Sequence, residues 1–86
     1  MTNEELRAIV TGELARVAPG NDLAAVDPDV DLRDALELDS MDFMSFVVGL
    51  HKALGVNIPE SDYPRIRTVR GCTEYLARAA AGRQTA

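Results

Sequence analysis

The sequence predicts an all-α fold, a small four-helix bundle of three main helices and one short helix, with a long loop between helices one and two. Apolar residues recur at helical spacing in three segments, and strand signals are confined to a brief stretch at 55–58. Only 5% of the chain is aromatic, so aliphatic packing must dominate. A chain of 86 residues supports one compact core, which we place in residues 1–80, followed by a flexible C-terminal tail at 81–86.

The first helix is predicted from its cap onward. Thr2 and Glu5 have the spacing of a capping box, and apolar residues then recur at helical spacing to about Val17. Pro19 and Gly20 end this helix, because proline lacks a backbone donor and glycine readily adopts positive φ.

The loop that follows extends to about Ser40 and is unusually long for a compact domain. We expect it to be ordered, with a helical turn or two, because apolar side chains spread along it can lie against the core. These residues are Leu23, Val26, Val30, Leu32, Leu36 and Leu38.

The second helix is predicted from Asp39 or Ser40 to Leu54, with Asp39 as N-cap and Gly55 in the left-handed position after the C-terminus. Pro59 then breaks the chain.

One short turn over residues 60–63 comes before the last helix, which Thr68 caps and which is predicted to run to about Ala80. Its expected buried stripe is Val69, Cys72, Tyr75, Leu76 and Ala79.

The second helix carries two apolar stripes on nearly opposite sides. Its core stripe is Phe43, Phe46, Val47, Leu50 and Leu54. The second stripe, Met41, Met44 and Val48, cannot enter the same core. Either the long loop covers it or it is a docking surface, for which adaptable methionines are suited.

Composition excludes several classes of function. A formal net charge of -5 argues against a nucleic-acid partner and favours basic protein partners. Cys72 is the single cysteine, which excludes an intramolecular disulfide and a thiolate metal cluster and is compatible with a reducing cytoplasm. Residues 1–16 have neither the pattern of a signal peptide nor that of a membrane span, so we expect a cytoplasmic protein without membrane insertion.

Ser40 stands at a helix N-terminus, where backbone N–H groups and the helix dipole would favour a seryl phosphate. The plain alternative is that Ser40 or Asp39 is only a helix cap. Enzyme activity is not expected, because His51 lies about 16 Å along the helix from Ser40, too far to act as its base. His51 is expected to be a solvated residue and Cys72 a core residue.

Four segments lie in register with one known family. The segment 39–42, Asp-Ser-Met-Asp, resembles the Asp-Ser-Leu-Asp signature of the acyl carrier proteins, whose serine carries 4′-phosphopantetheine. Residues 36–54 look like that family's site and second helix, 58–60 like its Ile-Pro-Asp/Glu step, and 66–76 like its last helix. The resemblance covers nearly the whole chain.

The resemblance implies a carrier without catalytic residues or a metal, whose covalent 4′-phosphopantetheine comes from coenzyme A and is attached to Ser40. Asp39 and Asp42 would be recognised beside it, and Met41, Met44, Val48 and Glu37 would face partners. The implied partners are a phosphopantetheinyl transferase and acyl-loading and acyl-processing enzymes of fatty-acid, polyketide or related lipid biosynthesis, with basic docking patches. A monomer is expected.

The chain departs from the family pattern at three positions. Glu37 replaces a usual glycine, Phe43 stands where a small polar residue is common, and Ser45 replaces a usual glutamate. Phe43 would support the fold or narrow an acyl cavity. Acidic residues gather before the serine while the C-terminal part is basic, whereas a generic fatty-acid carrier would be more uniformly acidic.

Other interpretations remain open at this level. An aminoacyl or peptidyl carrier would have the same fold. A non-catalytic helical interaction module would bind a partner helix through the methionine stripe. The acidic run at 27–42 could also bind a divalent cation weakly.

Overall fold

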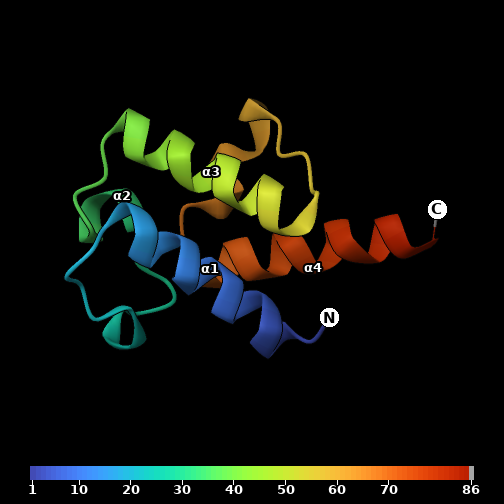
Figure 1. Cartoon of the computed structure of the whole chain (residues 1–86), viewed down its shortest axis with the longest axis horizontal. Coiled ribbons are helices and arrows are strands. Elements are labelled where there is room, and N and C mark those ends of the chain that lie inside the picture. The colour runs from blue at the N-terminus through green and yellow to red at the C-terminus, as the bar shows by residue number, and fades with distance from the viewer. Residues whose placement is uncertain (86) are drawn as a thin grey trace.

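A computed structural model describes the backbone of residues 1–85 and the side chains of residues 1–80. The described chain is helical and contains no strand, which confirms the predicted fold class. Its elements are α1 (Asn3–Val17), η1 (Leu23–Ala25), α2 (Leu32–Ala35), α3 (Ser40–Leu54), η2 (Glu60–Ile66) and α4 (Val69–Thr85). Helix α1 packs against both α3 and α4, and the loop with η1 and α2 lies at the end of the bundle where α3 begins (Figure 1).

Helix α1 begins as the capping box predicts. The Thr2 hydroxyl accepts a hydrogen bond from the Glu5 N–H at 3.1 Å, and the Glu5 carboxylate accepts one from the Thr2 N–H at 2.9 Å. The hydrogen bond from the Thr2 N–H, together with the Thr2 hydroxyl, lowers the pKa of the Glu5 carboxyl. Leu6, Val10 and Leu14 are fully buried along one face, which fixes how α1 lies on its neighbours.

Helix α3 has both of its predicted ends. Asp39 is the N-cap, with its carboxylate accepting from the Asp42 N–H at 2.8 Å, and Asp42 accepts in return from the Asp39 N–H at 3.3 Å. Gly55 closes the helix with a left-handed φ of 68°. The predicted core stripe is confirmed, with Leu54 partly buried and the other four residues buried.

The long loop is joined to the start of α4. Its backbone forms two hydrogen bonds there, Leu32 N–H to Arg67 O at 2.7 Å and Arg70 N–H to Pro28 O at 3.0 Å. Leu32, Leu36 and Leu38 are buried, and Leu23 and Val26 pack against the core, so the loop is anchored as predicted at these five positions. The sixth predicted anchor, Val30, is only half-buried.

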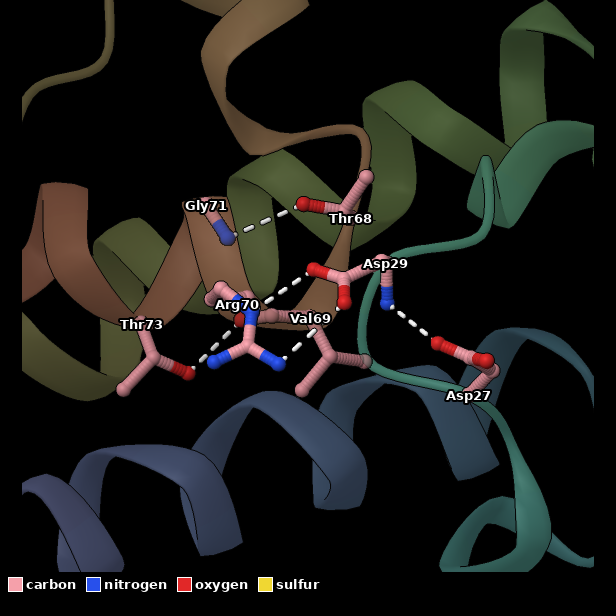
Figure 2. Close-up of polar contacts among 7 residues, drawn as sticks. All are labelled: Asp27, Asp29, Thr68, Val69, Arg70, Gly71 and Thr73. Atoms are coloured by element: carbon pink, nitrogen blue, oxygen red, sulfur yellow. Dashed lines mark hydrogen bonds and ion pairs between the residues drawn. The ribbon is translucent and has the colours of Figure 1, made fainter.

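Two ion pairs reinforce this seam. Figure 2 shows the Arg70 guanidinium facing both carboxylate oxygens of Asp29, at 2.6 and 3.2 Å. Asp31 pairs with Arg67 at 2.6 Å. The Asp29 pair lowers the pKa of the carboxyl and raises that of Arg70. Two of the acids gathered before the serine therefore neutralise two of the C-terminal arginines within the fold.

The last helix begins as predicted but ends later. The Thr68 hydroxyl accepts from the Gly71 N–H at 2.9 Å (Figure 2). Of the predicted stripe, Val69, Cys72 and Leu76 are buried, and Tyr75 and Ala79 are partly buried against the core. Helix α4 continues to Thr85, so the predicted end at about Ala80 is wrong. The prediction ended the helix where its apolar stripe ends, whereas the high helix propensity of alanine favours continuation of the helix beyond that stripe. The side chains of the predicted tail at 81–86 lie outside the described residues.

The remaining differences concern short elements. The turn predicted at residues 60–63 is the longer 3₁₀ helix Glu60–Ile66, which includes Pro64. The helical turns predicted in the long loop are confirmed as η1 and α2. No helix among the described residues has the length and apolar character needed to cross a membrane.

Replacing core residues of α3 should destabilise the fold. Phe46 and Leu50 have no exposed surface, so Phe46→Ala and Leu50→Ala should each lower the free energy of unfolding by about 2 to 5 kcal/mol. Urea denaturation followed by circular dichroism measures this. Met44→Ala, at a side chain that is 46% exposed, should cost less than about 1 kcal/mol, and an equal loss at Met44 and Leu50 would contradict the two-stripe assignment.

Candidate functional site at the start of helix α3

Ser40 is the first residue of α3 and is exposed. Of the two residues considered as the N-cap of α3, Asp39 has that role and Ser40 does not. Ser40 is exposed at the positive end of the helix dipole, with Asp39 and Asp42 on either side of it in the sequence.

The chain reaches Ser40 through a strained residue. Glu37 has a φ of 54°, in the left-handed region that glycine adopts freely, and it lies between the buried anchors Leu36 and Leu38. Glu37 directly follows Leu36, the C-cap of α2, and the Leu38 N–H donates to Arg33 O at 2.9 Å, which is the arrangement by which a left-handed residue ends a helix. This explains in physical terms why glycine would be favoured at this position.

A cation from α2 also reaches the serine. Arg33 Nη2 lies 3.4 Å from Ser40 Oγ, and the guanidinium carbon is 5.9 Å from the centre of the Phe43 ring. Asp31 caps α2 by accepting from the Arg33 N–H at 2.9 Å, which fixes the base of this side chain. No feature of the sequence predicted Arg33 at the site, because the contact depends on how α2 is folded against α3.

Phe43 supports the fold. Its buried ring packs against Phe46 at 5.9 Å between centroids and meets Tyr63 of η2 edge-on at 5.7 Å. The Tyr63 hydroxyl in turn lies 3.6 Å from the sulfur of Met44. Of the two roles considered for Phe43, these contacts support the structural one.

The second stripe of α3 is exposed, so the long loop does not cover it. Exposed fractions are 82% for Met41, 46% for Met44 and 42% for Val48, and with Met1 they are the large apolar side chains exposed in the described part of the chain. Glu37, Asp39 and Asp42 surround its Ser40 end. The stripe therefore runs away from the serine along an open face.

Beside this stripe, α1 and α3 form a shallow cleft that carries charges of both signs. Arg16 of α1 reaches across to Ser45, donating to its hydroxyl at 3.1 Å and its carbonyl at 2.7 Å. With Glu13, Lys52 and Val48, these residues line the cleft, and Glu13 pairs with Arg16 at 3.0 Å. Ser45, where the family pattern has glutamate, thus receives an arginine whose charge Glu13 already balances, and Lys52 adds a further positive charge.

Neither Cys72 nor His51 belongs to this site. Cys72 is fully buried in α4, and burial raises the pKa of its thiol to about 12. His51 is exposed, as predicted, with Nδ1 3.1 Å from the carbonyl oxygen of Val56. Among the described residues, no group of three or more acidic, histidine or cysteine side chains could hold a metal ion.

Comparison with known proteins identifies the family. Residues 4–76 match the family model described as "Phosphopantetheine attachment site". The acyl carrier protein of Syntrophobacter fumaroxidans is 37% identical over 59 residues, 69% of this chain and 73% of that protein. This chain belongs to the acyl carrier protein family. Acyl carrier proteins are carriers without catalytic activity of their own, and their covalent prosthetic group is phosphopantetheine.

Solved acyl carrier protein structures have the same fold. That from Enterococcus faecalis superposes with a TM-score of 0.74 at 26% identity, covering 92% of this chain and 99% of its own. The 3-oxo-butyl carrier of the actinorhodin polyketide synthase from Streptomyces coelicolor gives 0.66 at 27% identity, covering 95% and 93%. The all-helical fold and the long first loop are thus shared with the family.

The strain at Glu37 can be tested by removing its side chain. A left-handed non-glycine residue costs roughly 1–2 kcal/mol, and glycine returns part of this as extra entropy of the unfolded chain. Glu37→Gly should therefore raise the free energy of unfolding by about 0.5 to 1 kcal/mol, measured by urea denaturation. Glu37→Ala keeps the strain without the charge and should give no such gain; equal stabilisation by both would assign the effect to charge.

Proposed function

We propose that Ser40 carries the 4′-phosphopantetheine arm and that this chain presents acyl intermediates to partner enzymes. The observation that supports this best is the exposed Ser40 hydroxyl at the first turn of α3, next to an exposed apolar stripe. When attached, the arm supplies a terminal thiol that holds the acyl group as a thioester. The protein supplies a fixed attachment point and a surface by which enzymes recognise it.

The surroundings of Ser40 fit a phosphoester. The first N–H groups of a helix have no acceptor within the helix, and their dipoles favour a negative group. Asp39 and Asp42 already accept from each other's N–H groups in the capping box, so the cap stays intact when Ser40 is modified. The arm can therefore be added without unwinding α3.

The proposed docking surface is the exposed stripe of α3 with its acidic border. Apolar contacts would come from Met41, Met44 and Val48, whereas Glu37, Asp39 and Asp42 would pair with lysine or arginine on an incoming enzyme. A phosphopantetheinyl transferase and the acyl-loading and acyl-processing enzymes would share this surface. We propose that the chain works as a monomer in the cytoplasm.

The charge of the cleft beside α3 bears on the pathway. A partner that is basic along the whole helix would meet Lys52 beyond the acidic border, where like charges repel, whereas the charge of Arg16 is already balanced by Glu13. We therefore propose specialised enzymes of fatty-acid, polyketide or related lipid biosynthesis, basic only near Ser40. The similarity to a polyketide synthase carrier is consistent with this range.

Arm attachment is tested by intact mass. Incubation with coenzyme A and a promiscuous phosphopantetheinyl transferase should add one arm to the wild-type chain and none to Ser40→Ala. A thiol reagent should then find one reactive thiol in the folded, loaded protein. Cys72 should be silent, because a rise in thiol pKa from 9.0 to about 12 lowers the thiolate fraction roughly a thousandfold near neutral pH. Equal mass gain by Ser40→Ala would refute the proposal.

Docking is tested by loading rates. Met44→Glu should slow arm attachment at both low and high salt, because the new carboxylate is desolvated in an apolar contact. Asp42→Lys should slow it chiefly at low salt, since it acts through charge attraction. Arg78→Glu, at an exposed position on α4, is the matched control and should leave the rate unchanged. If arm attachment to Arg78→Glu were as slow as to Asp42→Lys, the docking surface could not be assigned to α3.

A further inference from the structure

We propose that Arg33 of α2 binds the phosphodiester of the arm and so restrains its root against the protein. This inference rests on attachment of the arm to Ser40. The ligand is a phosphodiester monoanion, held by a single guanidinium from an element that precedes the serine in the chain.

The distance from Arg33 to Ser40 supports the contact. Arg33 Nη2 is 3.4 Å from Ser40 Oγ, the oxygen that becomes a bridging ester oxygen when the arm is attached. The two free phosphate oxygens then lie two bonds from Oγ, within reach of the same nitrogen after a small side-chain movement. A planar guanidinium can donate two parallel hydrogen bonds to such a group.

The orientation of Arg33 is prepared before any phosphate arrives. Leu32, the preceding residue, is fully buried, and its N–H donates to Arg67 O at 2.7 Å, so α2 is fixed to the body of the protein. The Arg33 guanidinium then lies over the Phe43 ring at 5.9 Å from its centre, a cation–π distance. A preorganised side chain loses less conformational entropy when it binds.

The charge of Arg33 is also available. Within the described chain, Arg16, Arg67 and Arg70 form ion pairs with carboxylates, whereas Arg33 forms none. A phosphodiester on Ser40 would add a negative charge beside Asp39 and Asp42, and like charges at this distance repel. Arg33 is the cation placed to offset that repulsion, so its contribution should be larger in the loaded protein than in the unloaded one.

The test is a thermodynamic cycle on four proteins: wild type and Arg33→Gln, each with and without the arm. The measured quantity is the change in melting temperature on loading. Subtracting the melting temperature of the unloaded form from that of the loaded form cancels the contribution of the cation–π contact with Phe43, because that contact is present in both forms. The change in melting temperature on loading should be lower for Arg33→Gln than for wild type by about 1 to 6 °C. This difference between the two proteins should shrink at high salt. Arg78→Gln is the matched control and should behave as wild type.

Two spectroscopic readouts do not depend on stability. The phosphorus NMR signal of loaded Arg33→Gln should move toward its position in the urea-unfolded loaded protein. In the wild-type chain, loading should shift the Arg33 Nε–H signal and slow its exchange with water. This second measurement is made on the wild-type chain, so it decides the question even if Arg33→Gln folds poorly.

The possible failures are distinct. A wild-type chain that gains no mass would overturn attachment at Ser40 and this inference with it. A chain that gains the arm but shows the same change in melting temperature for wild type and Arg33→Gln, with an unshifted Arg33 signal, would overturn the Arg33 contact alone and leave the carrier function standing.

Discussion

The attachment of the long loop to the start of α4 is the constraint on which the functional end of this protein depends. Two backbone hydrogen bonds, Leu32 N–H to Arg67 O and Arg70 N–H to Pro28 O, join segments that are far apart in the sequence. They hold α2 in place, and α2 determines both the direction from which the chain enters α3 and the position of Arg33. A shift of this seam would move α2 and would therefore displace Arg33 relative to Ser40.

Ion pairs and apolar burial have different roles at the seam. The Asp29–Arg70 and Asp31–Arg67 pairs lie at or near the surface, where such pairs contribute little to stability and are screened by salt. The buried side chain of Leu32 and the paired backbone groups supply most of the free energy. The ion pairs favour one register of the loop against the start of α4, because a displaced loop would separate Asp29 and Asp31 from these arginines.

The sequence predicted what is local or periodic. The capping boxes at Thr2 and Asp39 need residues only three positions apart, and the two stripes of α3 follow from helical geometry, so both were found. The left-handed backbone of Glu37 was not predicted from φ preferences, although its place in a family glycine position was a signal for it. The Arg33 contact and the Asp31–Arg67 pair were also missed, because they depend on where the loop folds back and no local pattern encodes that.

The buried thiol of Cys72 has a consequence for cargo retention. An acyl thioester can be lost by exchange with a neighbouring thiolate. A reactive cysteine on a carrier would accept the acyl group from the arm, and partner enzymes could not use it there. Burial in α4 and a pKa of about 12 make Cys72 almost entirely protonated and inaccessible. In the proposed carrier function, the packing that builds the core would also keep Cys72 from accepting the acyl group, so retention of the cargo would depend on the stability of the fold.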